Sequence, residues 1–294
     1  DRLSDFRLEK NIAETIGNVE YEVIAFDNRN THYGLCEIYN LCAEKSRYDN
    51  LCFAHEDIQF DTIGWGEKII SKLSETDCGV IGFAGTTARI SALCGIGLSR
   101  AHWRSNYIQH MNKGGMKSCF KNPDRVEFSP VVSVDGMCLF VSRKVWQKVR
   151  FDEKTFPNFH LYDLDFTTAV FRAGCINYIC NTVIVEHFSE GYYTQEWLAA
   201  TIDFNNKWRN ALPLYVSGFP CIKNLDRYVR SREFRFIKAM MKSRGKCSWE
   251  LIDGLCRQYY RKYPFYRQIL LNQPLFRIFR LCILMGRSYE VGGQ

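Results

Sequence analysis

The chain has 294 residues, of which 46% are hydrophobic and 15% aromatic, so it can bury a full core and is not expected to be disordered. Its formal net charge of +7 is unevenly distributed, because residues 215–294 contain 16 Lys and Arg against 5 Asp and Glu. We therefore predict a slightly acidic globular body over residues 1–214, followed by a basic extension.

Cysteine usage and hydropathy indicate the cellular compartment in which the protein resides. Thirteen cysteines are scattered without a CxxC pair or the Cys/His spacing of a zinc site, which is typical of reduced thiols in a cytosolic protein. We expect no signal peptide, and the apolar run Leu275 to Met285 is too short and too often interrupted by arginine to span a bilayer. We expect a cytoplasmic protein, at most peripheral on the inner face of the membrane.

The first part of the chain alternates between helical and strand patterns. Residues 3–16 place apolar side chains at helical spacing and predict a helix that ends at Gly17. The apolar segment YEVIAF at 21–26 predicts a buried strand, residues 33–46 a second amphipathic helix, and residues 50–55 a second strand. Strand, helix and strand in this order predict a right-handed βαβ unit in a parallel sheet.

The alternation continues along the chain. Further helices are predicted near 63–74, 143–149 and 163–173, and further strands at 78–85, 129–143 and 178–188. Residues 86–128 mix glycine, basic residues and histidine without a clear period and predict a long functional loop region. The whole pattern predicts an α/β sandwich with a mostly parallel central sheet.

From residue 215 onward, arginine and lysine alternate with bulky apolar residues at helical spacing, interrupted by Pro264 and Pro274. We place a domain boundary here and predict a basic amphipathic helical extension over residues 215–294. Its apolar faces are expected first to pack on the preceding domain or on a second subunit of a homodimer, and second to contact an anionic membrane surface. A nucleic-acid surface is the weaker interpretation, because no recognised nucleic-acid motif accompanies the charge.

Three ionisable residues, His55, Glu56 and Asp57, stand at the end of the second predicted strand. Ligands of open α/β sheets bind outside the carboxyl ends of the strands, so this triplet is expected to face a pocket. Carboxylate oxygens suit Mg²⁺ or Mn²⁺, which commonly bridges a protein to substrate phosphates, so the triplet can hold a metal nucleotide. The alternative is a solvated strand-to-helix turn with Asp57 as a cap.

The order of these segments over about residues 20–212 resembles the GT-A fold glycosyltransferases, in particular the bacterial family-2-like group. The triplet is similar to the family's Asp-x-Asp motif: Asp57 matches the second, metal-binding carboxylate, and His55 stands where the first Asp is usual. The segment DGMCLFVSR resembles the glycine turn beside the donor sugar, which implies that Gly136 lets the backbone approach the ligand closely.

Two later segments carry the catalytic roles that the resemblance implies. FHLYDLDFTTAVFRAG is similar to the family's Glu-Asp motif at the start of a helix, with Tyr162 in the Glu position and Asp163 as general base. A helix N-terminus stabilises the ionised carboxylate, which predicts a weak base, and helix capping is the alternative for Asp163. VIVEHFSEG contains a strand that ends at His187, which resembles the histidine that binds metal and diphosphate together with Asp57.

The resemblance implies further contacts with donor and acceptor. Asp27 and Asn28 match the position that holds the base or ribose of the nucleotide, with a turn cap as the alternative for Asp27. Relatives open with a β-strand whereas this chain begins with a helix, so either the first strand is missing from this sequence or the sheet is one strand shorter. The residues expected to face the acceptor are His102, Trp103, Arg104, His160 and Tyr162.

The resemblance implies a hexosyltransferase-like enzyme that moves a sugar from a nucleoside diphosphate sugar to a hydroxyl of a glycan or lipid-linked acceptor. The resemblance implies Mn²⁺ or Mg²⁺ as cofactor, inversion at the anomeric carbon, and a role in surface polysaccharide or glycan synthesis. Because both motifs have lost an acidic residue, a catalytically degenerate sugar-binding or scaffold protein is the alternative. The enzymatic interpretation requires Asp57, Asp163 and His187 to converge around one cavity.

Overall fold

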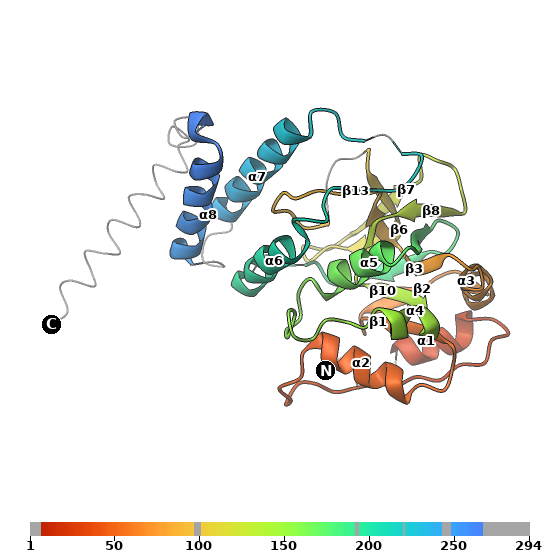
Figure 1. Ribbon diagram of the computed structural model, residues 1–294. Helices are drawn as coiled ribbons and strands as arrows, with labels where there is room; N and C mark the ends of the chain where they lie inside the picture. Colours follow the sequence, from red (N-terminus) through yellow and green to blue (C-terminus); the bar gives the residue numbers. More distant parts are fainter. Residues whose placement is uncertain (1–6, 97–100, 192–193, 220, 243–247, 267–294) are drawn as a thin grey trace. The chain divides into compact units, whose positions relative to one another are not determined.

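The computed structural model describes residues 7–96, 101–191, 194–219, 221–242 and 248–266 (Figure 1). The chain divides into two compact units. The first unit comprises residues 1–90, 95–191 and 206–221, and the second comprises residues 91–94, 192–205 and 222–294. Among the described residues, none of the helices has the length and hydropathy needed to cross a membrane.

The first unit contains a mixed five-stranded sheet. Its strands, in spatial order, are β1 (Asn50–Ala54), β10 (Cys138–Ser142), β3 (Cys78–Gly82), β11 (Ile176–Cys180) and β8 (Phe128–Val131). Within this sheet only β3 and β11 pair in parallel. The α/β class is confirmed, but the prediction of a mostly parallel sheet is wrong. Strand β10 follows a tight turn at Gly136 and Met137 instead of a helical crossover, and it runs antiparallel between β1 and β3.

A second sheet lies in the same unit. Its strands, in spatial order, are β2 (Ile58–Phe60), β12 (Val185–His187), β6 (Trp103–His110), β4 (Ala84–Thr86) and β9 (Ser133–Val134), and β7 (Met116–Lys121) also pairs with β6. A separate two-stranded sheet consists of β5 (Ala88–Arg89) and β13 (Leu214–Tyr215). The prediction of a long loop over residues 86–128 is wrong, because β6 and β7 form an antiparallel hairpin. Basic and polar side chains interrupt the apolar alternation in both strands, which hides their period.

Residues 21–26, predicted as a buried strand, have no strand partner in the described part of the chain. Tyr21, Val23 and Ile24 are 38%, 44% and 36% exposed. The predicted βαβ unit is therefore wrong, and β1, which follows α2 (Leu35–Lys45), pairs with the antiparallel β10. An apolar run forms a buried strand only where a neighbouring strand and a covering layer exist, and the run itself encodes neither.

Helix α1 (Arg7–Thr15) satisfies the free edge of β2. The side chain of Asn11 donates to the carbonyl of Phe60 at 2.9 Å and accepts the N–H of the same residue at 2.7 Å, as a neighbouring strand would. The indole N–H of Trp65, at the start of α3 (Trp65–Leu73), donates to the hydroxyl of Thr15 at 3.0 Å. These polar contacts attach α1 to both the sheet and α3.

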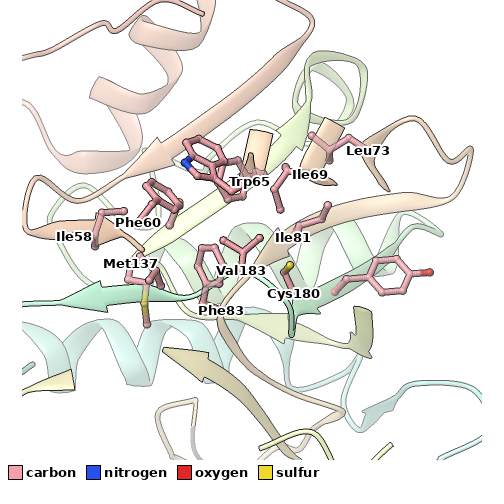
Figure 2. Close-up of a cluster of buried hydrophobic side chains, with 14 of the residues drawn as sticks. Ile58, Phe60, Trp65, Ile69, Leu73, Ile81, Phe83, Met137, Cys180 and Val183 are labelled. Carbon is pink, nitrogen blue, oxygen red and sulfur yellow. The ribbon is translucent and has the colours of Figure 1, made fainter. Parts of the chain in front are cut away.

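One hydrophobic core of the first unit contains Trp65, which stacks on Phe60 with ring centroids 4.2 Å apart (Figure 2). Each large side chain buried in such a core contributes about 1.5–3 kcal/mol. Met137 belongs to this core, so the turn that precedes β10 is anchored from one side. Figure 2 labels ten of its members: Ile58, Phe60, Trp65, Ile69, Leu73, Ile81, Phe83, Met137, Cys180 and Val183.

The remaining helices are α4 (Arg143–Lys148), α5 (Tyr162–Arg172) and α6 (Gln195–Trp208), and the second unit adds α7 (Leu225–Lys242), α8 (Trp249–Lys262) and the 3₁₀ helix η2 (Pro264–Tyr266). The second unit has its own core, in which Leu198 of α6 packs with apolar residues of α7 and α8. Buried Glu233 pairs with Lys262 at 2.8 Å. The apolar spacing of these helices is thus used inside the unit, and the domain boundary at residue 215 stays a prediction.

Asn177 is completely buried at a register shift between β3 and β11. Its carboxamide oxygen accepts the N–H of Val80 at 2.9 Å, and its nitrogen donates to the carbonyls of Val132 at 2.8 Å and Thr167 at 2.7 Å. One side chain therefore completes the backbone hydrogen bonding where the ladder is interrupted.

We predict that Asn177→Leu lowers the free energy of unfolding by about 2–4 kcal/mol, because three buried backbone groups lose their partners. Urea denaturation should show the loss as a lower midpoint. The control Asn18→Ala, at an exposed position, should change stability by less than about 0.5 kcal/mol. Equal effects of the two variants would contradict the structural role of Asn177.

Candidate functional site

Three side chains at strand ends lie together in the first unit. His55 follows β1, Asp57 precedes β2, and His187 ends β12. The pairing of β2 with β12 places His187 opposite Ile58, directly beside Asp57. Oδ1 of Asp57 lies 3.7 Å from Nε2 of His187 and 3.9 Å from Nδ1 of His55. The structure thus brings Asp57 and His187 together, as predicted, and adds His55 to them.

This His-Asp-His cluster (His55, Asp57 and His187) can hold a metal ion. One ligand atom from each residue lies within 4.8 Å of the other two. The separations exceed hydrogen-bond lengths, and Nε2 of His187 is buried without a hydrogen-bond partner. Burial lowers the pKa of His55, which keeps its imidazole neutral and its lone pair available. A buried nitrogen without a partner, facing a carboxylate, fits a divalent cation between them.

A further acidic group lies at the start of α5, where Asp163 accepts the N–H of Gly136 at 2.9 Å. Burial, followed by the charge of the neighbouring Asp135, raises the pKa of Asp163 to about 7. The expectation of a weak base at a helix N-terminus is therefore wrong, because burial and Asp135 outweigh the helix dipole and the backbone donors. A pKa near neutrality suits a general base.

Tyr162 and Gly136 connect Asp163 to the His-Asp-His cluster. The hydroxyl of Tyr162 donates to the carbonyl of Gly136 at 3.1 Å and lies 2.8 Å from Nε2 of His55. A Cβ at position 136 would collide with the Tyr162 hydroxyl, so glycine is required for this close approach. The glycine expected beside a donor sugar is therefore packed against Tyr162 and Asp163. One hydrogen-bonded arrangement joins the candidate base to the candidate metal ligands.

Residues 10–210 match the family described as glycosyltransferase like family, which is more than half of the chain. The chain belongs to this family. The match confirms the resemblance that the strand-end motifs indicated, together with the GT-A type of α/β fold that the resemblance implied. No protein of curated function matches the sequence significantly.

Two solved structures are distantly similar to this member of the glycosyltransferase family. The crystal structure of GalNAc-T7 with UDP, GalNAc and Mn²⁺ is 10% identical with a TM-score of 0.41, over 84% of this chain and 46% of that chain. The crystal structure of A197 from STIV is 16% identical with a TM-score of 0.35, over 64% of this chain and 79% of that chain. The chain thus spans less than half the length of the first, and the family assignment rests on the sequence match.

Asp27 and Asn28, expected at the nucleotide, lie in an exposed segment before α2. Asp27 pairs with Arg29 at 2.6 Å, and hydrogen bonds from Arg29 lower the pKa of Asp27 to about 2. The backbone N–H of Arg29 also donates to Asp27 at 3.1 Å, which closes a local turn. Glu56 is exposed. The roles of these residues toward a nucleotide stay predictions.

His102, Trp103 and Arg104, expected at the acceptor, lie at or just before the start of β6, whereas the cluster lies near its end. Gln109, which contacts the cluster, follows Trp103 by six residues, or about 20 Å along a strand. Arg104 is buried and pairs with Asp124 at 2.6 Å. The structure does not bring these three acceptor candidates to the His-Asp-His cluster.

The other two acceptor candidates, His160 and Tyr162, lie closer to the cluster. Tyr162 is 4% exposed, and its hydroxyl is used by His55 and Gly136, which leaves no surface for an acceptor. The expected acceptor contact of Tyr162 is therefore wrong. His160 is partly exposed, and its ring packs edge to face with the ring of Phe159, with ring centroids 5.4 Å apart.

Sequence reasoning missed four contributions to the site. His55 was singled out within the triplet, but only Asp57 and His187 were named as metal ligands. Asp135 stood unremarked before Gly136 although the segment itself was singled out. Phe159 is 55% exposed and its ring lies 5.8 Å from that of His55, which only the structure reveals. Gln109 contacts a residue 78 positions away, so no local pattern could have signalled it.

We predict that Asp163→Asn raises the melting temperature more at pH 8 than at pH 5. The folded protein raises the pKa of Asp163 to about 7, so folding favours the protonated acid. Because of this group, the free energy of unfolding decreases as the pH rises from about 4 to about 7. Asparagine keeps an acceptor oxygen for Gly136 but carries no charge. The increase in melting temperature caused by Asp163→Asn should be larger at pH 8 than at pH 5 by at least about 2 °C.

Thermal denaturation of the wild type and the variant at both pH values checks this difference. The control Asp49→Asn, at an exposed position, should show no such difference. Identical gains at both pH values would show that the pKa of Asp163 is not raised.

Proposed function

We propose that this protein is a metal-dependent glycosyltransferase that moves a sugar from a nucleoside diphosphate sugar to an acceptor hydroxyl, with inversion at the anomeric carbon. The observation that supports this most is the hydrogen-bonded connection between the His-Asp-His cluster and Asp163 through Tyr162 and Gly136. Family membership supports the reaction class. The geometry supports a metal site and a base in one unit.

His55, Asp57 and His187 would hold the divalent cation. One carboxylate and two neutral imidazoles suit Mn²⁺ better than Mg²⁺, because Mg²⁺ prefers oxygen ligands in a regular octahedron. When bound, the cation offsets the negative charge that develops on the diphosphate leaving group. We therefore propose Mn²⁺ as the preferred cofactor and Mg²⁺ as the weaker one.

Asp163 would accept the proton of the attacking hydroxyl. With a pKa of about 7 it is partly ionised at neutral pH and basic enough to take a proton late in the transfer. The N–H of Gly136 holds one carboxylate oxygen at 2.9 Å and so fixes the orientation of the base. General-base assistance of this kind contributes about 10²–10⁴-fold. Direct attack of the hydroxyl on the donor sugar, without a covalent intermediate, accounts for the proposed inversion.

The substrates are proposed to be a nucleoside diphosphate sugar and a glycan or lipid-linked acceptor, in surface polysaccharide or glycan synthesis. The exposed ring of Phe159, beside His55, offers an apolar face against which a sugar ring can pack. His160 lies next to this ring and can hydrogen-bond a sugar hydroxyl.

We propose a cytoplasmic location, with the second unit touching an anionic membrane surface. Exposed arginines of α7 and α8 supply the charge, among them Arg227, Arg235, Arg257 and Arg261. Because the apolar positions of these helices already form a core, such contact would depend on charge and on Phe265, which is 95% exposed. A homodimer formed through the same unit is the competing proposal.

We predict that Asp163→Asn lowers the rate of sugar transfer by about 10²–10⁴-fold while Mn²⁺-dependent binding of a nucleoside diphosphate changes by less than about twofold. Asp57→Asn should instead weaken the binding itself, because it removes the carboxylate of the His-Asp-His cluster. Calorimetry with uridine and guanosine diphosphates measures binding, and a panel of nucleotide sugars measures transfer and hydrolysis.

The control for both variants is Asp49→Asn, an exposed aspartate that should behave as the wild type. Wild-type protein that binds no nucleotide in the presence of Mn²⁺ would instead support the degenerate sugar-binding or scaffold protein.

We predict that kcat/KM rises with pH and levels off above about pH 7, because Asp163 must be ionised to accept the proton. Asp135→Asn should shift this profile to lower pH, because the charge of Asp135 is the second cause of the raised pKa. Initial rates from about pH 5 to pH 9 check both statements. A profile that does not respond to Asp135→Asn would remove Asp163 from the role of base.

A further inference from the structure

Each histidine of the His-Asp-His cluster directs one ring nitrogen toward Asp57 and the other toward a fixed hydrogen-bond partner. We infer that Tyr162 and Gln109 are positioning residues that hold the two histidines in opposite tautomers, so that the unprotonated nitrogens face the metal site. These are Nδ1 of His55 and Nε2 of His187. The inference rests on the proposed function, because it concerns the same metal site.

The tautomer of His55 follows from the contacts of Tyr162. The carbonyl oxygen of Gly136 can only accept, so the Tyr162 hydroxyl uses its single hydrogen in that 3.1 Å contact. The hydroxyl oxygen is then the acceptor in its 2.8 Å contact with His55, and Nε2 of His55 must carry the hydrogen. A neutral imidazole has one N–H, so Nδ1, which lies 3.9 Å from Asp57, keeps its lone pair.

The tautomer of His187 follows from the orientation of the Gln109 carboxamide. Nε2 of Gln109 lies 2.9 Å, 3.2 Å and 2.8 Å from the carbonyl oxygens of His110, His187 and Ser189. Three acceptors around one end of the amide identify that end as the nitrogen, so the other end is Oε1, which lies 3.3 Å from Nδ1 of His187. An oxygen without hydrogen must accept there, so Nδ1 is protonated and Nε2 keeps its lone pair.

The two arguments agree with an independent observation. Nε2 of His187 is buried and has no hydrogen-bond partner, as expected for a lone pair reserved for a ligand. Because His55 presents Nδ1 to Asp57 and His187 presents Nε2, the two rings need opposite tautomers. With equal tautomers, one N–H would point at the cation and repel it. Tyr162 therefore acts on the metal through His55.

The tautomers can be measured in the metal-free wild-type protein. Long-range ¹H–¹⁵N correlation spectra, at a pH where the imidazoles are neutral, distinguish Nδ1–H from Nε2–H. The chain has six histidines, so signals of the two ligands are assigned from His55→Gln and His187→Gln. We expect Nε2–H at His55 and Nδ1–H at His187. The other tautomer at either residue, or exchange between both, overturns the inference.

Variants of the two positioning residues supply a second test. Tyr162→Phe and Gln109→Met should each weaken Mn²⁺ binding in calorimetry by about 10–100-fold, and should give mixed tautomers at His55 and His187 respectively. The matched controls are Tyr178→Phe, a tyrosine of the hydrophobic core, and Gln59→Met, an exposed glutamine of β2. Both controls should bind Mn²⁺ within about twofold of the wild type.

The outcomes separate this inference from the proposed function. Folded variants of Tyr162 and Gln109 that bind Mn²⁺ as tightly as their controls overturn the positioning role. If either variant fails to fold, the spectra of the wild type decide. A wild type that shows both expected tautomers but binds no Mn²⁺ contradicts the proposed function and leaves the tautomer assignment standing.

Discussion

The peptide groups around Gly136 hold the candidate site together. The N–H of Gly136 donates to Asp163 at 2.9 Å and its carbonyl accepts from Tyr162 at 3.1 Å, so one residue binds both the candidate base and the side chain that contacts His55. The next residue, Met137, is buried in the core and its carbonyl accepts the N–H of His55 at 3.1 Å. The distance between base and metal ligands is therefore set by backbone anchored in a packed core, which is the preorganisation that catalysis requires.

Helix α5 carries two carboxylates near its start that are stabilised in different ways. Asp165 is buried and forms an ion pair with Lys207 at 2.8 Å, which gives it a structural role. Asp163 relies on backbone donors, and the charge of Asp135 works against its ionisation. Leu161, just before the helix, adopts a left-handed φ of 63°, which is uncommon for a residue with a branched side chain. Burial of an acid near another acid and backbone strain both reduce stability, and such features concentrate at functional sites.

The local part of this site could be predicted from the sequence, whereas its connections could not. His55 follows an apolar strand, His187 comes two residues after an apolar run, and Asp163 lies at the start of an apolar helix. Such changes of polarity are visible in a single sequence. The contacts of Tyr162 with His55 and of Gln109 with His187 span 107 and 78 residues, and no period encodes them. The errors in the fold have the same cause: an apolar run indicates a strand, but its partner, its direction and its burial depend on segments far away along the chain.

The charges of the ligands give the His-Asp-His cluster its own electrostatic character. Asp57 contributes one negative charge and the two imidazoles contribute none, so a divalent cation held there keeps a net charge near +1. Two carboxylates in the same place, as in an Asp-x-Asp motif, would neutralise the cation. The remaining positive charge is free to attract a diphosphate, whose own negative charge increases as the sugar departs. Because the cluster has only one carboxylate, the protein alone attracts the cation less strongly than a two-carboxylate site would. This favours joint binding of metal and nucleotide over binding of either by itself.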